Sequence, residues 1–588
     1  MTFVRTGGRT GGQPSMATAI RVRFPDLEHW KAQVKCQAGC PVATDAGRYV
    51  QLIAEGRDED AFLVARAPNP FASVCGRVCA APCEDACRRG SIDAPISIRA
   101  LKRFVTEQYG VESRRPDTQD RLLREPIKEG NRYSGHLPIH PAGGFADRGG
   151  AKKTFSEGNT EGGGAAETPA PPLASGAAPV PPSSPSKKSP GSPGSLGSPA
   201  RKVAVIGAGP AGLSAAHDLA LLGYSVTVFE AAGEPGGMMR VGIPEYRLPR
   251  TLIKAEIDRI LSFGVALRLG TPLTPDFGLS ELRAEGYEAV FLSVGVSKGR
   301  DLQVPGVELD GVVKAVDYLL NVNRGFRMDL GRRVVVIGGG FVAFDAARTA
   351  LRMGREADVD ALEEKAGEAD ARLKEALDSA RAALRGGAAE VTLVSLENFE
   401  EMPVLRTTQG HEEFEEAKKE GVRFHTRRGP HRFVGSGRLK AVELKKVTSV
   451  FDESGRFAPA YDESDVVMLE ADACVLAIGQ KADLSFLKQG DGIALTPAGT
   501  IAVDKTTLAT SAPGIFAGGD VAFGPRNLIE AVANGKRAAR SIHEHLAKER
   551  ASIHATLEIE KIPTSSYRMI AGFEILDREA PPTLDLGR

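Results

Sequence analysis

The chain has 588 residues, of which 75 are basic, 75 are acidic and 42% are hydrophobic. This length predicts several domains, and the balanced charge gives no reason to expect a nucleic acid or another polyanion as a partner. No apolar run is long enough to span a bilayer, so the sequence predicts no membrane insertion. Residues 1–24 lack the apolar core of a secretory signal and are predicted to be a disordered leader.

Residues 25–135 are predicted to form a helical domain that carries most of the cysteines. Helical patterning such as "GRYVQLIAEGRDEDAFLVARA" fills this region, and six of the seven cysteines lie in it. Clustered cysteines without a secretion signal favour metal binding in a reducing, cytoplasmic compartment over a disulfide framework. The six are Cys36, Cys40, Cys75, Cys79, Cys83 and Cys87.

The run "VCGRVCAAPCEDACRRG" repeats cysteine every four residues, which is also the spacing of one stripe on a helix. Pro82 argues against an uninterrupted helix there. Zinc is the alternative metal, although structural zinc sites use paired cysteines in two separate halves. "CQAGCP" has the Cys-Pro ending of iron–sulfur runs, in which the cysteine before proline serves a different cluster from its predecessors. On this pattern Cys40 joins the downstream group, and Cys36 belongs to a different site.

A break in composition separates this domain from the rest of the chain. Of the 60 residues from 141 to 200, 42 are Gly, Pro, Ser or Ala. Such a stretch cannot bury enough apolar surface to offset its chain entropy. Residues 136–200 are therefore predicted to be a flexible linker.

From residue 201 onward, short β-branched runs alternate with helical patterns, which predicts an α/β fold with parallel sheets. "VAVIGAGPAGL" places Gly207, Gly209 and Gly212 between a strand and a helix. These glycines allow a tight turn, close approach of a diphosphate and close helix–strand packing. Glu230 ends the next strand, where its carboxylate is placed to accept hydrogen bonds from ribose hydroxyls.

A second copy of this motif, "VVVIGGGFVAFD", predicts a second dinucleotide site. It contains Gly338 and Gly340, with Ala343 in place of the third glycine, and its next strand leads to Glu397. Between the motif and that strand, residues 356–387 are rich in Ala, Glu, Leu, Arg and Lys. This insertion is predicted to be a solvated helical hairpin.

Two further stretches identify the cofactors through a resemblance. "GIFAGGDVAFGP" and "EPGGMMRVGIPEYRLP" resemble flavoproteins with two dinucleotide domains, and in particular the small subunit of glutamate synthase and the N-terminal half of dihydropyrimidine dehydrogenase. The resemblance implies two Rossmann-like domains, for FAD and NAD(P), preceded by an α-helical iron–sulfur domain. It implies that residues 201–312 and 473–550 bind FAD and that residues 313–472 bind the nicotinamide nucleotide. Residues 551–588 lie outside the resemblance and are predicted to form a peripheral tail.

The resemblance, together with the two glycine motifs, gives a set of expected cofactor contacts. For FAD these are Gly207, Gly209, Pro210, Ala211, Gly212, Glu230, Gly237, Arg247, Gly519 and Asp520, and for the nicotinamide nucleotide Gly338, Gly340, Phe341, Val342, Glu397, Arg406, Ala477 and Gly479.

The resemblance also implies how many clusters the helical domain holds. Relatives have two further cysteines where this chain has Glu28 and Lys31, and a glutamine ligand of dihydropyrimidine dehydrogenase falls near Lys102. A second cluster would therefore lack nearly all its ligands. We expect one [4Fe-4S] cluster, with Cys75 not a ligand and Cys36 unassigned. Its ligands would be Cys40, Cys79, Cys83 and Cys87.

A disulfide reductase shares both Rossmann units but needs a redox cysteine pair near the flavin. After Met238 the sequence contains only Cys474, inside the apolar run "CVLAIG", which is typical of a buried strand. The sequence therefore argues against this class.

The choice between NADH and NADPH rests on the end of the second strand of the second unit. Glutamate synthase small subunits have an arginine pair there for the 2′-phosphate, whereas this chain has Leu396 and Glu397. A carboxylate at Glu397 would accept from a free 2′-hydroxyl and repel a phosphate, which favours NADH. Arg406, which matches a later family arginine, and a merely solvated Glu397 leave NADPH open.

These parts predict an enzyme that passes electrons from NAD(P)H through FAD to the cluster, and on to an electron-accepting protein outside this chain. The alternative is a redox-sensing or assembly subunit whose flavin does not turn over. The chain has neither the amidotransferase that glutamate synthesis needs nor the FMN barrel that pyrimidine reduction needs, so the acceptor stays open.

Overall fold

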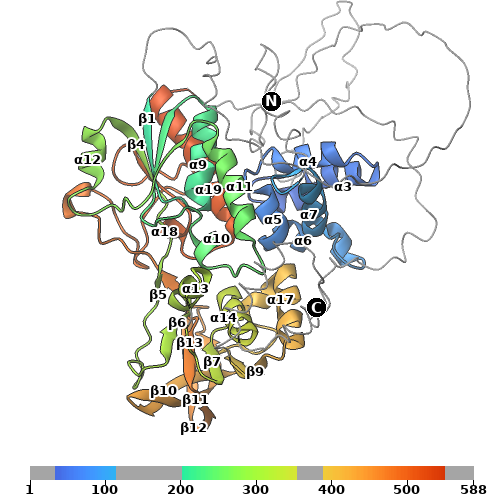
Figure 1. The fold of residues 1–588 in the computed structure, drawn as a ribbon, viewed down its shortest axis with the longest axis vertical. Coiled ribbons are helices and arrows are strands. Elements are labelled where there is room, and N and C mark those ends of the chain that lie inside the picture. Colours follow the sequence, from blue (N-terminus) through green and yellow to red (C-terminus); the bar gives the residue numbers. More distant parts are fainter. Residues whose placement is uncertain (1–32, 114–200, 327, 354–387, 550–588) are drawn as a thin grey trace, which may run out of the picture. The chain divides into compact units, whose positions relative to one another are not determined.

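The protein is described by a computed structural model that covers residues 33–113, 201–326, 328–353 and 388–549 (Figure 1). These residues belong to one compact unit. The predicted leader and C-terminal tail lie outside the described residues. So do the predicted linker, the 356–387 insertion and the positions of Glu28 and Lys31.

The N-terminal region is helical, as the sequence predicts. Tyr49, Leu52, Phe62 and Val105 are fully buried in its core. Pro82 is the first residue of a helix, and the residue before it is in a left-handed conformation, so the cysteine run does not form one continuous helix. The helices are α2 (Lys35–Gly39), α3 (Ala46–Ala54), α4 (Asp58–Arg66), α5 (Ala72–Val78), α6 (Pro82–Asp85), η1 (Arg88–Ser91) and α7 (Ile98–Tyr109).

The first nucleotide-binding unit is built on a parallel five-stranded sheet of order β15-β4-β1-β2-β3. Alternate residues of β1 point to opposite faces of this sheet. Val203 and Val205 join a core with α9, α11 and α19, whereas Ala204 and Ile206 join a second core with α12. The elements are β1 (Lys202–Ile206), α9 (Pro210–Leu221), β2 (Ser225–Phe229), α10 (Met238–Val241), α11 (Arg250–Leu261), β3 (Ala266–Arg268), α12 (Leu279–Ala284), β4 (Tyr287–Leu292), β15 (Ile515–Ala517), α18 (Asp520–Phe523) and α19 (Leu528–Ala547).

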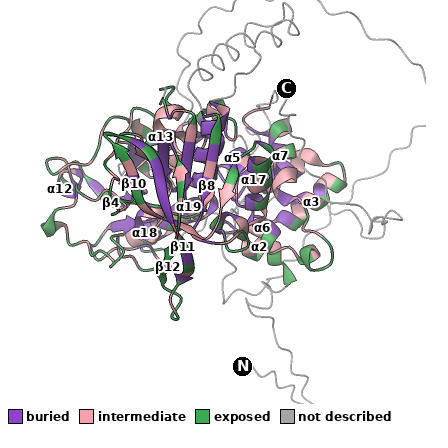
Figure 2. Ribbon diagram, turned by 90° about the horizontal axis from the view of Figure 1, so that it is seen from below, coloured by how far each residue is buried: buried purple, intermediate pink, exposed green. Residues whose placement is uncertain are grey.

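The second unit repeats this plan with a parallel sheet of order β6-β13-β7-β8-β9, beside a three-stranded antiparallel sheet of order β10-β11-β12. The central strands β7, β8 and β13 of its parallel sheet are largely buried, whereas the edge strands β6 and β9 are partly exposed; Figure 2 shows the burial of β8. The elements are β6 (Val312–Lys314), α13 (Ala315–Asn323), β7 (Arg333–Ile337), α14 (Phe341–Arg352), β8 (Glu390–Val394), η2 (Pro403–Arg406), α17 (Thr408–Lys419), β9 (Arg423–His425), β10 (Arg428–Ser436), β11 (Arg438–Phe451), β12 (Phe457–Glu470) and β13 (Ala473–Leu476).

The predicted domain boundary at 472/473 needs one correction. Strand β13 pairs with β6 and β7 in the second sheet, so residues 473–476 belong to the second unit. The chain returns to the first unit only after this strand, through η3 (Gln489–Asp491) and β15. Two short strands in the segments that connect the two units, β5 (Lys298–Gly299) and β14 (Gln480–Lys481), pair with each other. The apolar run of β13 is fully buried because both faces of a parallel sheet are covered.

The cysteine-rich helices pack directly on the first nucleotide-binding unit. Val74 and Val78 of α5 belong to the same hydrophobic core as Val203 of β1. The buried carboxylate of Glu256, in α11, accepts hydrogen bonds from the backbone N–H groups of Ser73 (2.9 Å) and Val74 (3.2 Å). Because these N–H groups lie in the first turn of α5, Glu256 caps the helix that leads to Cys79.

We predict that Glu256→Gln loosens this contact. One of the two N–H groups would face an amide N–H₂ group instead of an acceptor, at a cost of about 1–3 kcal/mol in the free energy of unfolding. Burial raises the pKa of Glu256 from 4.5 to about 7. Its protonation therefore stabilises the folded chain below about pH 4.5, and this contribution is lost as the pH rises through 7. Denaturant unfolding at pH 5 and pH 8 measures how far the free energy of unfolding falls between these two pH values. This fall should be smaller for the variant than for the wild type.

The matched control is Asp258→Asn, two residues along α11, where the exposed carboxylate pairs with Lys254 at the surface. This change should leave unfolding nearly unaltered. Equal unfolding curves for wild type and Glu256→Gln at both pH values would contradict the assigned role.

Candidate active site

The first glycine turn has the geometry that a dinucleotide needs. Gly207 has a φ of +102°, and a Cβ added there would lie 2.6 Å from the Ser293 carbonyl oxygen. A Cβ on Gly212 would lie 2.0 Å from the Gly207 carbonyl oxygen, so α9 packs against its own turn. At Gly209, by contrast, the nearest atom is the Cα of Gly237, 4.0 Å away. The turn is closed by protein on two sides and open where a diphosphate would approach.

Glu230 stands at this turn, as the sequence predicts. It directly follows β2, and its carboxylate accepts hydrogen bonds from the N–H groups of Ala208 (2.7 Å) and Ala232 (2.8 Å). Each carboxylate oxygen keeps a second lone pair, which is available to ribose hydroxyls. The side chain is thus held in place by the turn itself.

Two other predicted FAD contacts lie close to the same turn. A Cβ added to Gly237 would lie 2.9 Å from the Cα of Gly209. A Cβ added to Gly519 would lie 3.1 Å from the Cβ of Ala211. Asp520 begins α18 and accepts a hydrogen bond from the Arg526 N–H at 3.2 Å. Burial raises the pKa of Asp520 to about 6.

Arg247 lies between the two units. Its guanidinium donates to Asp345 at 2.6 Å and pairs with Glu413 at 2.9 Å, and both carboxylates belong to the second unit. Burial would lower the pKa of Arg247, but these two carboxylates outweigh that effect and raise it. Arg247 borders the central cavity described below, but its charge is already matched by protein groups.

The second glycine turn matches the first. Gly338 has a φ of +145°, and a Cβ there would lie 2.5 Å from the carbonyl oxygen of Ala477, whereas Gly340 faces open space. The carboxylate of Glu397 lies 3.2 Å from the position of a Cβ on Gly339, and it accepts a 2.6 Å hydrogen bond from the Ser395 hydroxyl. Glu397 therefore faces the turn, three residues beyond the end of β8, and is not merely solvated.

Two predicted nucleotide contacts are further from this turn. Arg406 ends η2 and is exposed; it lines a separate open crevice together with Cys87. Gly479 has a φ of +101° and approaches Arg300. The structure thus brings Glu397 to the turn but does not place Arg406 in the central cavity.

The helices that follow the two glycine turns border one cavity of about 220 Å³ with their first residues. Pro210 borders it from the first unit, and Phe341 and Val342 border it from the second. Val78 and Ala80, which flank Cys79, form part of its wall. The predicted flavin site, nicotinamide site and cysteine-rich helices therefore meet at a single apolar space.

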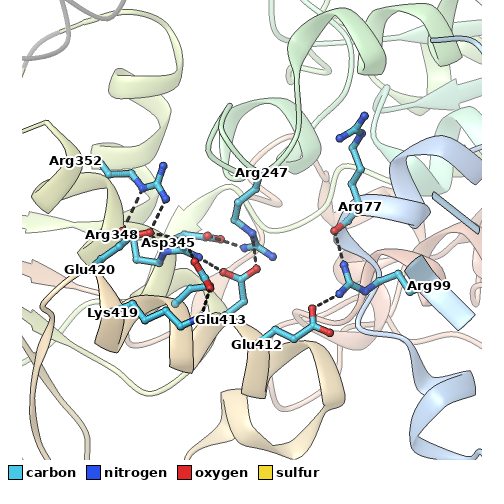
Figure 3. A network of polar contacts seen from close by, with 11 residues as sticks. Arg77, Arg99, Arg247, Asp345, Arg348, Arg352, Glu412, Glu413, Lys419 and Glu420 are labelled. Atoms are coloured by element: carbon cyan, nitrogen blue, oxygen red, sulfur yellow. Dashed lines mark hydrogen bonds and ion pairs between the residues drawn. The ribbon is translucent and has the colours of Figure 1, made fainter. Parts of the chain in front are cut away.

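Helix α17 ties these three parts together (Figure 3). Figure 3 shows Arg99 of the cysteine-rich helices pointing to Glu412, and Arg247 of the first unit pointing to Glu413, the next residue. Asp85 also accepts hydrogen bonds from the N–H (2.9 Å) and hydroxyl (2.7 Å) of Thr408, at the start of this helix. The first unit and the cysteine-rich helices thus contact the same two turns of α17.

The predicted cluster ligands fall into two groups. Lys102 is 8% exposed, and the strongest electrostatic partners of its ammonium are Cys40, Cys75, Cys79 and Cys83. Burial raises the pKa of Cys36, and the neighbouring Cys87 adds to this effect. A hydrogen bond from Cys75 lowers the pKa of Cys79 to about 7, and Lys102 adds to this effect.

Several thiols of this donor set surround a buried positive charge. No group of three or more His, Cys, Asp or Glu side chains in the described ranges could hold one metal ion. Burying Lys102 among thiols is costly unless they carry negative charge, as cluster ligands do. Cys40, Cys79 and Cys83 are all among the strongest electrostatic partners of Lys102.

Three residues that line the cavity were not predicted from the sequence. Val78 and Ala80 were not singled out, although their position beside Cys79 was a usable signal. Gln409, which is 2% exposed, lines the cavity from the first turn of α17, and no motif marks it.

Comparison with known proteins agrees with this arrangement. Residues 201–535 match the family described as pyridine nucleotide-disulphide oxidoreductase. The chain belongs to this family. Residues 31–113 match dihydropyrimidine dehydrogenase domain II, a 4Fe-4S cluster domain. The protein is thus an oxidoreductase that uses FAD, NADH or NADPH, and a 4Fe-4S domain, as the sequence predicts. Within the matched family segment the sequence has one cysteine, Cys474, which is fully buried in β13, so it lacks the cysteine pair of disulfide reductases.

Curated relatives support the resemblance to glutamate synthase and dihydropyrimidine dehydrogenase. The β subunit of the NADP(+)-dependent formate dehydrogenase of Moorella thermoacetica is 36% identical over 518 residues, which cover 87% of this chain and 60% of that protein. The glutamate synthase [NADPH] small chain of Azospirillum brasilense is 27% identical, with 89% of both chains covered. The NAD-dependent dihydropyrimidine dehydrogenase subunit PreT of Escherichia coli K12 is 28% identical, covering 87% of this chain and 90% of PreT.

The chain spans only part of one of these relatives, covering 60% of the length of the formate dehydrogenase subunit. The three relatives are named for different nucleotides: NADP(+), NADPH and NAD. None of the helices in the described ranges is both long and apolar enough to cross a bilayer.

We predict that two glycines of the first turn respond differently to alanine. Gly209→Ala places its Cβ in open space, so the fold should persist, but the methyl group blocks the diphosphate and should weaken FAD binding by roughly tenfold or more. Gly212→Ala drives its Cβ into a carbonyl oxygen and should destabilise the fold by about 1–3 kcal/mol. FAD content and melting temperature, measured together, separate the two effects. A Gly209→Ala protein with full FAD content would contradict this geometry.

Proposed function

We propose that this chain oxidises NADH, passes the electrons through FAD to one [4Fe-4S] cluster in the cysteine-rich helices, and delivers them to a separate acceptor protein. The observation that carries the proposal is the shared cavity. It is bordered by Pro210 after the first glycine turn, by Phe341 after the second, and by Val78 and Ala80 on either side of Cys79.

The residues of the chain supply position and charge in this scheme. When bound, FAD supplies the conversion of an electron pair to single electrons, and the cluster supplies a one-electron acceptor. Gly207, Gly209 and Glu230 orient the first dinucleotide, and Gly338, Gly340 and Glu397 orient the second. Residues that line the apolar cavity exclude water from the space where the two rings meet.

NADH is the proposed donor because of the position of Glu397. Its carboxylate faces the second glycine turn, where the adenosine ribose of a bound nucleotide would lie. A free 2′-hydroxyl can donate a hydrogen bond to this carboxylate, whereas a 2′-phosphate would be repelled. Arg406, the candidate phosphate ligand, lines a different crevice.

The proposed cluster ligands are Cys40, Cys79, Cys83 and Cys87. The first three share the electrostatic neighbourhood of the buried Lys102, whose charge would offset part of the negative charge of a thiolate-bound cluster. Clustered thiols suit a reducing compartment, so we place this activity in the cytoplasm.

An acceptor outside this chain is proposed because the relatives are named as subunits or chains of larger enzymes. Cys87 lines the open crevice between the cysteine-rich helices and η2, so this side of the predicted cluster faces outward. Electrons would leave the chain there.

Anaerobic reduction tests the proposal. NADH should bleach the flavin absorption band at about 450 nm, and should do so at a lower concentration than NADPH. Glu397→Gln removes the carboxylate charge but keeps the side-chain shape, so it should shift the NADH/NADPH preference toward NADPH by roughly tenfold. The readout is the nucleotide concentration that gives half-maximal flavin reduction.

A matched control is Glu390→Gln at the other end of β8, where the exposed carboxylate pairs with Arg423. This variant should keep the wild-type preference. Failure of both nucleotides to bleach the flavin would overturn the proposed function, whereas an unchanged preference in Glu397→Gln would overturn only the assignment of NADH.

Iron and acid-labile sulfide content test the cluster ligands. Wild-type protein purified without oxygen should contain about four irons per chain, and Cys79→Ser should lose most of them. Cys75→Ser should keep them, because Cys75 is not a proposed ligand. About eight irons in the wild type, or loss of iron from Cys75→Ser, would contradict this ligand set.

A further inference from the structure

The side chain of Gln409 is an unsatisfied polar group inside the central cavity. Gln409 is 2% exposed and lines the cavity from the first turn of α17. Its Nε2 is buried and has no hydrogen-bond partner among the described residues. A buried donor without an acceptor costs about 1–3 kcal/mol, so its retention here indicates an acceptor supplied from outside the protein.

Several other polar groups in the cavity wall are already partnered. Asp345 accepts from Arg247 at 2.6 Å, and Asp520 accepts from the Arg526 N–H at 3.2 Å. Asn527 takes part in a capping box with Glu530 at the start of α19. Among the described residues of this wall, Gln409 is the one whose side-chain nitrogen is both buried and without a hydrogen-bond partner.

The backbone holds Gln409 in this position from both sides. Asp85 binds the N–H of Thr408, and the Thr407 hydroxyl accepts a 3.1 Å hydrogen bond from the Gly410 N–H. A Cβ on Gly410 would lie 1.6 Å from the Val404 carbonyl oxygen, so the first turn of α17 is pressed against η2. The amide cannot leave the cavity by a small shift of the helix.

The location of Gln409 favours one ligand atom. Nε2 can only donate, so its partner is an acceptor, and a carbonyl oxygen on a ring system in the cavity is the chemistry that fits. Helix α17 belongs to the second unit and packs against α14, the helix that begins at the second glycine turn. A residue on α17 therefore stays fixed relative to the nucleotide bound there.

We propose that Gln409 donates a hydrogen bond through Nε2 to the carboxamide oxygen of the bound nicotinamide, and so positions that ring against the flavin. The inference rests on the proposed function, because it assumes that the second unit binds a nicotinamide nucleotide. A carbonyl of the flavin ring offers the same chemistry and is the competing acceptor.

The test uses the full chain with FAD bound and compares NADH with thionicotinamide NADH, in which a poorly accepting sulfur replaces the carboxamide oxygen. Gln409→Met keeps the length of the side chain and removes the donor. It should weaken NADH binding, measured as the concentration for half-maximal flavin reduction, by roughly five- to thirtyfold. With the thio analogue, Gln409→Met should change the concentration for half-maximal flavin reduction by no more than about twofold.

Two further variants keep the test interpretable. Gln409→Leu also removes the donor and should resemble Gln409→Met. Gln51→Met changes an exposed glutamine on α3, which pairs with Glu55, and should behave as wild type. Equal FAD content, and a melting temperature no lower than that of the wild type across the set, exclude misfolding as the cause.

Three results would overturn the proposal. NADH binding could be unchanged in Gln409→Met, or both nucleotides could be weakened equally, which would indicate a packing role. The flavin absorption spectrum could instead shift in the absence of nucleotide, with NADH binding unaltered, which would assign the hydrogen bond to the flavin. Failure of the wild-type flavin to be reduced by any nucleotide is a different outcome and would contradict the proposed function itself.

Discussion

The pairing of buried charges around helix α17 is the constraint on which the site depends. Arg247 and Arg348 both bind Glu413, and Arg348 and Arg352 both bind Glu420. Buried ions must be matched, and removing one partner typically costs about 3–5 kcal/mol. The network therefore fixes the loop before α11 in the first unit against α14 and α17 in the second. The width of the cavity between the two glycine turns follows from this fixed contact.

The cysteine-rich helices are held to the same framework by different interactions. Glu256 of the first unit caps α5, and Asp85, between Cys83 and Cys87, contacts the start of α17 in the second unit. Arg99 adds an ion pair with Glu412. The segment around Cys79 is thus anchored at both of its ends, and its side toward the cavity is apolar. Val78 and Ala80, which flank Cys79, thus line the cavity together with residues of both nucleotide-binding units.

The sequence predicted the local parts of the site well, because local chemistry determines them. A glycine turn needs its small residues at fixed spacing, and an acid at the end of the next strand follows from parallel pairing, so Gly207, Glu230 and Glu397 could be placed without a structure. The partners of Arg247 could not be foreseen, because Asp345 and Glu413 lie about 100 residues or more along the chain and meet it only through the packing of two units.

The same reason explains the remaining differences. Strand β13 returns to the second sheet before the chain re-enters the first unit, and an apolar run does not reveal which sheet it joins. Gln409 carries no motif, and its role appears only where α17 faces the cavity. Cys40, Cys79 and Cys83 come near Lys102 through the folding of α5, α6 and α7 around one another, which the spacing of the cysteines in the sequence does not reveal.

The central claim is that electrons pass from the nicotinamide through the flavin to the cysteine-rich helices within one chain. A single-turnover reaction with NADH, followed by flavin absorbance in stopped flow and by low-temperature EPR of freeze-quenched samples, tests it most directly. The account predicts that a reduced-cluster signal follows flavin reduction with a rate constant that does not depend on protein concentration. A rate that rises in proportion to protein concentration, or flavin reduction without any cluster signal, would contradict it.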